Sequence, residues 1–139
     1  MTHDKMGRAC DAALLKSFSV LYVEDDEEIR NQLVQFLKRR VGALHVAANG
    51  HEGLLAFDVH QPDIVITDIL MPVMTGLQMA EKIKKLSPST PIIATTAFNE
   101  SQFSLKAVDI GVDKFAIKPV SGTALVDMLQ QCAHTLLAK

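Results

Sequence analysis

Residues 63–72 read DIVITDILMP, and this stretch decides the fold. The apolar run Ile64–Ile66 shows no alternation with polar residues. Such a run is typical of a strand in a parallel sheet that is covered by helices on both faces. Asp68 follows almost at once, so we expect a carboxylate at the carboxyl end of this strand.

On both sides of this stretch, short β-prone runs alternate with segments whose apolar residues recur at helical spacing. Several of the helical segments begin at good capping residues, such as Thr75 with Gln78 in a capping-box pattern. The expected strands are 19–23, 44–48, 64–66, 92–95 and 114–117. Two expected helices cover 27–40 and 50–60, and three more begin at Thr75, Asn99 and Ser121. The apolar positions of these helices include Leu54, Leu55, Val59, Leu77, Ala80, Ile83, Leu86, Phe103 and Cys132.

Five alternations of strand and helix predict an α/β domain with a parallel sheet between two helical layers. Right-handed crossovers leave few arrangements, and we expect the flavodoxin-like (βα)5 doubly wound sandwich with strand order 2-1-3-4-5. Residues 18–139 form this domain, and residues 1–17 are expected to be a tail or a short extra helix. In such folds ligands bind beyond the carboxyl ends of the strands, near strands one and three.

Composition excludes several other classes of protein. The chain has 139 residues, 48% hydrophobic and 22% charged, which suits one globular domain. The net charge of -2 gives no reason to expect direct nucleic-acid binding. We see no membrane-spanning segment or signal peptide, and Cys10 and Cys132 do not form a disulfide framework, so a reducing, cytoplasmic location is expected.

Polar residues gather at the predicted strand ends. Glu24, Asp25 and Asp26 follow strand one, Asp68 ends strand three, Thr95 and Thr96 end strand four, and Lys118 follows strand five. Three carboxylates in one crevice repel each other unless a cation joins them, and Mg²⁺ (or Mn²⁺) is the natural partner of oxygen ligands.

With such a metal bound, Asp68 can act as a nucleophile that forms an aspartyl phosphate, while Thr96 and Lys118 hold phosphoryl oxygens. Each residue taken singly has a simpler interpretation. The acids after strand one could favour the dipole of the next helix, which we prefer for Asp26, Glu27 and Glu28. Asp68 could be a loop acid and Lys118 a solvated charge.

Together these residues resemble a known family. The matching segments are LYVEDD at 21–26, DIVITDILMP at 63–72, TTA at 95–97 and KP at 118–119. Over roughly residues 18–138 the chain resembles the receiver (CheY-like) domain of two-component response regulators. The resemblance implies that Asp68 is the phosphoacceptor. It also implies a metal held by Asp25, by Glu24, by Asp68 and by the backbone carbonyl of Leu70.

The same resemblance implies the parts of a switch. Thr96 is the switch hydroxyl, Lys118 pairs with the phosphate, and Phe115 is the aromatic that changes rotamer. Because Phe115 lacks a hydroxyl, only packing can hold it inward. The Lys118–Pro119 bond is expected to be cis, and the apolar residues Leu70 and Phe98 predict slow self-dephosphorylation.

The function expected is that of a signalling switch in a two-component phosphorelay. A sensor histidine kinase or a histidine phosphotransfer protein is expected to donate the phosphoryl group to Asp68. The face formed by helix four, strand five and helix five then changes. This face is expected to engage an output domain or protein that is not part of the 139 residues. The domain is not an enzyme with a separate substrate. One rival is a haloacid-dehalogenase-type phosphatase, which needs an aspartate where Leu70 stands; another is a partner-binding domain without phosphorylation, against which the complete acidic set argues.

Overall fold

The computed structural model describes residues 13–71, 73–97 and 104–138. At its centre lies a sheet of five parallel strands in the order β2-β1-β3-β4-β5. This order confirms the predicted flavodoxin-like arrangement. The strands are β1 (Ser19–Val23), β2 (Ala43–Ala47), β3 (Ile64–Asp68), β4 (Ile92–Thr96) and β5 (Lys114–Ile117).

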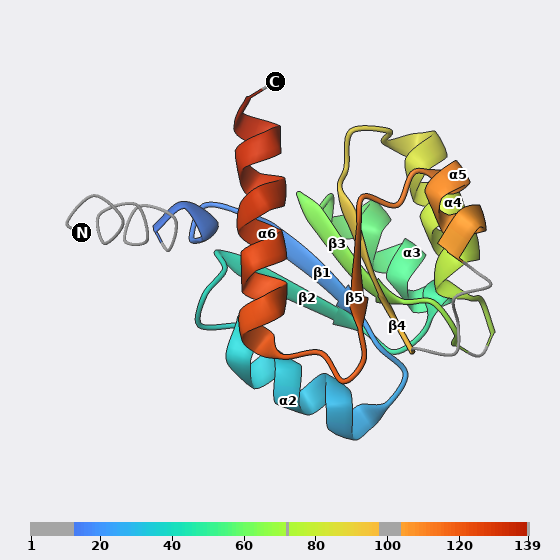
Figure 1. The fold of residues 1–139 in the computed structure, drawn as a ribbon, viewed down its shortest axis with the longest axis horizontal. Helices are drawn as coiled ribbons and strands as arrows, with labels where there is room; N and C mark the ends of the chain where they lie inside the picture. Colours follow the sequence, from blue (N-terminus) through green and yellow to red (C-terminus); the bar gives the residue numbers. More distant parts are fainter. Residues whose placement is uncertain (1–12, 72, 98–103, 139) are drawn as a thin grey trace.

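Helices cover both faces of the sheet, with α2 and α6 on one face and α3, α4 and α5 on the other (Figure 1). The core is therefore split into two layers, and every residue of β3 and β4 is buried between them. The helices are α2 (Glu27–Leu37), α3 (Gly50–His60), α4 (Gly76–Leu86), α5 (Ser104–Ile110) and α6 (Gly122–Leu137).

Local signals set the ends of the helices. Thr75 and Gln78 form the predicted capping box at the start of α4, and Ser121 caps α6 by accepting a hydrogen bond from the Ala124 amide. Gly111 follows α5 with φ +107°, a conformation that favours glycine. The predicted cap Asn99 and the predicted core residue Phe103 lie outside the described residues, as does Cys10.

Three residues that we gave among the apolar positions of the helices are exposed. Leu55, Val59 and Leu86 are 57%, 72% and 71% exposed. The buried residues of α3 are Gly50, Gly53 and Phe57. A Cβ added to Gly53 would lie 2.5 Å from Met79 Sδ, so the helix approaches its neighbours closely there. Leu55 and Val59 are not among these buried residues, and Leu86 stands on the last turn of α4.

The segment before β1 also contributes to the core. Residues 13–15 are helical, and Leu15 is 1% exposed among the side chains beneath α2 and α6. The Gly42 amide donates hydrogen bonds to the Leu15 and Phe18 carbonyls, at 3.0 and 2.9 Å, which ties this segment to β2.

Cys132 is a buried free thiol, and burial raises its pKa from 9.0 to about 11. Within the described part of the chain, every helix is too short or too polar to cross a bilayer.

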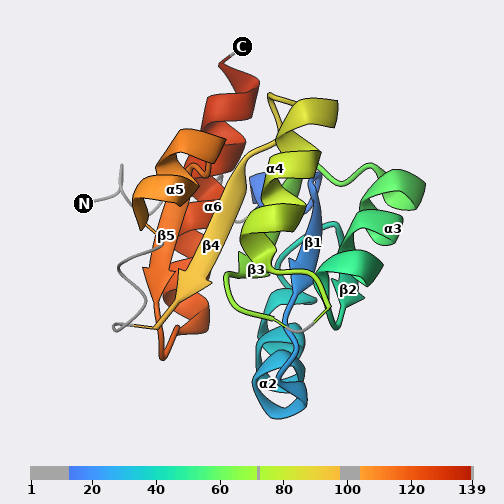
Figure 2. The same ribbon diagram turned by 90° about the vertical axis from the view of Figure 1, so that its right-hand side faces the viewer.

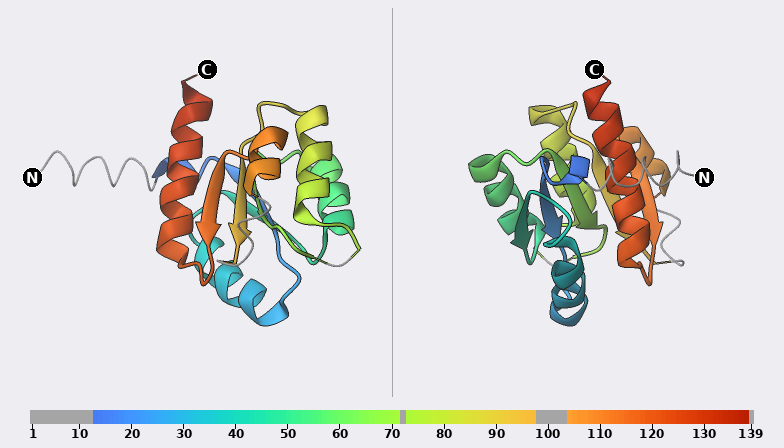
Figure 3. Two further views of the ribbon diagram at one scale, coloured as in Figure 1. Left: turned by 45° about the vertical axis from the view of Figure 1, so that its right-hand side comes forward. Right: turned by 90° about the vertical axis from the view of Figure 1, so that its left-hand side faces the viewer.

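The strands all run in one direction, so their carboxyl ends meet at a single edge of the sheet. The arrowheads of the ribbons in Figures 2 and 3 mark this edge. The residues at the carboxyl ends of β1, β3, β4 and β5 therefore lie along this edge, and the polar residues predicted at strand ends are among them or directly follow them.

Candidate functional site

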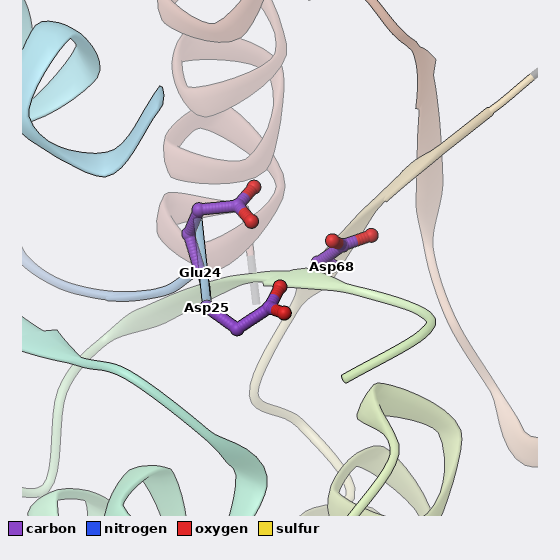
Figure 4. Close-up of side chains that lie close together, drawn as sticks. All are labelled: Glu24, Asp25 and Asp68. Carbon is purple, nitrogen blue, oxygen red and sulfur yellow. The ribbon is translucent and has the colours of Figure 1, made fainter. Parts of the chain in front are cut away.

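Three carboxyl groups meet beyond the ends of β1 and β3. Glu24, Asp25 and Asp68 each offer an oxygen, and these oxygens lie within 4.8 Å of one another. Figure 4 shows the three side chains converging from the two neighbouring strands. Glu24 and Asp68 are buried, at 1% and 3% exposure, whereas Asp25 is exposed. One side of the cluster is therefore open to solvent.

The backbone around Glu24 holds this acid in place. The Glu24 amide donates to the Ala47 carbonyl at 3.1 Å, which extends the pairing of β1 with β2 by one step. Its carboxylate accepts a hydrogen bond of 3.1 Å from the Asp26 amide, and its carbonyl accepts one of 2.8 Å from Arg30. The sequence did not lead us to Arg30, which bridges the first turns of α2 back to the site.

Asp26 itself has a structural role. Its side chain accepts a hydrogen bond of 3.0 Å from the Ile29 amide and caps α2, and Glu27 and Glu28 stand in the first turn of that helix. The interpretation of these three acids as partners of the helix N-terminus is confirmed.

Lys118 reaches the buried carboxylates from β5. Its Nζ lies 2.7 Å from Asp68 Oδ2 and 3.7 Å from Glu24 Oε1. The Lys118 amide donates to the Thr96 carbonyl at 2.8 Å, which keeps this lysine in line with the end of β4. The Lys118–Pro119 peptide bond is cis, as expected from the sequence.

The pKa of Glu24 reflects the burial and the charges of the cluster. The pKa of its carboxyl is raised from 4.5 to about 7; burial is the main cause and the charge of Asp68 also raises it, while the Asp26 amide and Lys118 act in the opposite direction. One ammonium thus compensates the negative charge of this site only in part.

Thr96 and Phe115 lie on the face of the sheet that α3, α4 and α5 cover. Thr96 is 7% exposed, and Phe115 is half-buried against the core layer beneath α3, α4 and α5. Phe115 pairs with Ala94 and Thr96 pairs with Ile117 in the register of β4 and β5, so the two predicted switch residues lie on adjacent strands with an offset of two residues. Leu70, two residues after Asp68, has a side chain that is 42% exposed.

A close approach of backbone to backbone shapes the loop after Asp68. The Gly76 amide donates to the Ile69 carbonyl at 2.7 Å, and a Cβ added to Gly76 would lie 1.8 Å from the Asp68 carbonyl oxygen. Only glycine fits there, so Gly76 fixes the distance between α4 and Asp68. In the sequence, the glycine directly after the capping residue Thr75 was the signal that could have pointed to this close approach.

The donor set fits a hard divalent cation. Carboxylate oxygens that face one another within a few ångströms, two of them buried, favour a small cation with oxygen ligands over a soft transition metal. The unequal exposure of Asp25 and Asp68 leaves room for water on one side, which suits Mg²⁺.

Comparisons with known proteins place the chain in a family. Residues 20–130 match the family model of the response regulator receiver domain. The chain belongs to this family of regulatory domains. It is 31% identical over 110 residues to the chemotaxis protein CheY of Halobacterium salinarum, covering 79% of this chain and 92% of that protein.

A second relative is longer. The transcriptional regulatory protein AfsQ1 of Streptomyces coelicolor is 32% identical over 107 residues; the match covers 77% of this chain and 47% of AfsQ1. Among solved structures, the N-terminal domain of an uncharacterized protein from Wolinella succinogenes superposes with a TM-score of 0.81 at 34% identity, covering 88% of this chain and 98% of that one. The chain thus spans nearly all of a single receiver domain and less than half of AfsQ1.

Proposed function

We propose that this receiver domain accepts a phosphoryl group on Asp68 from a phosphohistidine of a sensor histidine kinase or a histidine phosphotransfer protein. The observation that carries the proposal is the contact of Asp68 with Lys118, at 2.7 Å, inside a cluster that also holds Glu24 and Asp25. This set combines a nucleophilic carboxylate, a cation for phosphoryl oxygens and two further acids at the carboxyl ends of neighbouring strands.

Glu24, Asp25 and Asp68, together with the backbone carbonyl of Leu70, would hold Mg²⁺ (or Mn²⁺). When bound, this ion supplies positive charge that offsets the repulsion between the acids and the incoming phosphoryl oxygens. The convergence of the three carboxyl groups supports this assignment.

In the reaction, an oxygen of the Asp68 carboxylate forms a bond to phosphorus while the bond from phosphorus to the histidine nitrogen breaks. The imidazole leaves with the electron pair of that bond and takes up a proton from solvent. Lys118 then pairs with a phosphoryl oxygen in place of Asp68 Oδ2, and the Thr96 hydroxyl donates to a second one. Most of the catalytic effect is positioning and charge compensation.

The switch follows from the movement of Thr96 toward the phosphoryl group. This movement vacates space beside β5, and Phe115 packs inward to fill it. The face formed by α5, β5 and α6 changes and engages an output domain or protein. The half-buried state of Phe115 supports two available positions for its ring.

Phosphorylation of the whole chain by acetyl phosphate and Mg²⁺ tests the proposal. We expect intact-mass spectrometry to detect one base-labile phosphoryl group in the wild type and in Asp58→Asn, whose acid is exposed on α3, but none in Asp68→Asn. Labelling of Asp68→Asn at the wild-type level would overturn the assignment of the phosphoacceptor.

A further inference from the structure

A cavity of about 330 Å³ opens on the face of the sheet that α2 and α6 cover. Its floor includes Tyr22 of β1 and Thr95 of β4, and α2 contributes Ile29 and Leu33 to its wall. Small-molecule sites in proteins typically have about this volume or more and are mostly apolar, with a few polar groups that orient the ligand. The cavity is separate from the face on which Thr96 and Phe115 lie.

Two of the residues that line this cavity carry a hydroxyl group with no hydrogen-bond partner among the described residues. Tyr22 Oη and Thr95 Oγ1 are buried, in residues that are 1% and 2% exposed, and neither forms a hydrogen bond within the described residues. A buried polar group left unsatisfied costs about 1–3 kcal/mol. The Tyr22 hydroxyl, like that of Thr95, can donate a hydrogen bond as well as accept one.

The rest of the lining restricts what could bind these hydroxyls. Pro119 and Val120 add apolar surface from the loop between β5 and α6. Glu24 and Lys118 also border the cavity, 3.7 Å from each other, so an anion would face a carboxyl group and a cation would face an ammonium. A neutral molecule avoids both repulsions.

We propose that this cavity is a binding site for a small uncharged organic molecule that has an apolar body and one strong hydrogen-bond acceptor, such as a carbonyl. The Tyr22 and Thr95 hydroxyls donate to the acceptor, and the side chains of Ile29 and Leu33 cover the body. The proposal does not depend on phosphorylation of Asp68, although an occupant would lie beside Glu24 and Lys118 of that site.

Amide NMR of the full chain in a metal chelator tests the site with acetophenone as the probe. We expect saturable shift changes at Tyr22, Leu33 and Val120, with a dissociation constant in the millimolar range or below, as suits so small a ligand. Ethylbenzene, which lacks the carbonyl, should bind about fivefold to tenfold more weakly. Benzoate and benzylammonium, which carry a charge, should also bind more weakly than acetophenone.

Variants separate recognition from folding. Tyr22→Phe and Thr95→Val should each weaken acetophenone binding about fivefold and leave ethylbenzene binding unchanged. Thr90→Val, which removes a buried hydroxyl bonded to Ser87 outside the cavity, should leave both unchanged. Absence of saturable shifts with acetophenone, which would mean that the cavity holds only water, would overturn the proposal. Equal affinities for acetophenone and ethylbenzene, or an equal loss in Thr90→Val, would do the same.

Discussion

The ammonium of Lys118 lies 2.7 Å from Asp68 Oδ2, and the Asp68 side chain is 5% exposed. A buried carboxylate at the end of β3 is therefore compensated by a cation from β5, two strands away in the sheet. If Asp68 is the phosphoacceptor, this contact has two roles. It stabilises the nucleophile before the reaction, and it holds the ammonium where the phosphoryl oxygens will be.

The first prediction concerns this ion pair. Replacing Lys118 with Met removes the cation and leaves Asp68 buried without it. Because one partner of a buried pair is lost, we expect the free energy of unfolding in chelator to fall by about 1–3 kcal/mol; the Lys118 side chain is 25% exposed, which moderates the loss. Urea denaturation measures it. Lys82→Met, at an exposed position of α4, is the control, and an equal effect of both variants would contradict the prediction.

A second prediction concerns the repulsion among the acids. Asp25→Asn removes one charge of the cluster and should raise the free energy of unfolding in chelator by about 1 kcal/mol, a modest gain because Asp25 is exposed. The same variant should lose most of the stabilisation that Mg²⁺ gives the wild type. Thermal melts with and without Mg²⁺ measure both effects.

Glu81→Gln, which neutralises an exposed acid in the middle of α4, is the matched control for Asp25→Asn. It should leave both melts near those of the wild type. A clear loss of stability in Asp25→Asn in chelator would show that the acids do not repel one another in the folded state.

The third prediction follows from the pKa of Glu24, which is raised from 4.5 to about 7. Between these values the folded state keeps a proton that the unfolded state has lost, so the free energy of unfolding falls as the pH rises from about 4.5 to 7. Glu24→Gln cannot titrate, and its loss between pH 5 and 8 should be smaller than that of the wild type by about 1–3 kcal/mol. Urea denaturation in chelator at both pH values tests this; parallel pH profiles would refute it.

The fourth prediction concerns the lifetime of the phosphoryl group. Leu70 is apolar and cannot orient an attacking water, so Leu70→Asn should speed release of phosphate from the labelled protein several-fold. Release is followed by intact-mass spectrometry after removal of acetyl phosphate. Val73→Asn, at another exposed apolar position of the same loop, is the control. Release from Leu70→Asn no faster than from this control would count against shielding by Leu70. Phe98, the other residue predicted to slow hydrolysis, lies outside the described residues.

The convergence of Glu24, Asp25, Asp68 and Lys118 was predictable because the topology of a parallel sheet brings strand ends together. Helix caps such as Thr75 and Ser121 were predictable because their hydrogen bonds are local. These features depend on chain direction and on neighbours within a few residues. Neither requires knowledge of how one helix packs against another.

Features that depend on packing were not predictable. Helical spacing gave Val59 and Leu86 as apolar positions of their helices, but spacing alone does not show which of these positions the fold buries; in α3 the buried residues are Gly50, Gly53 and Phe57. Tyr22 and Thr95 stood in β-prone runs with nothing to show that their hydroxyls would share a cavity. The side-chain torsions that bring Lys118 to Asp68 are likewise invisible in a sequence.

The last prediction separates phosphorylation from switching. Thr96→Ala keeps the acids and Lys118, so labelling of Asp68 should persist. What should weaken is the bias between two arrangements of β5 and α5, because the modified site no longer interacts differently with them. In the wild type, a beryllofluoride mimic of the phosphate should move the amide NMR signals of Phe115, Ala116 and the residues of α5. In Thr96→Ala the same signals should move clearly less at confirmed occupancy, whereas Thr90→Ala, outside the site, should respond as the wild type does. Equal movement in Thr96→Ala would mean that the hydroxyl does not couple the site to this face, and the loop after Asp68 would then have to carry the change.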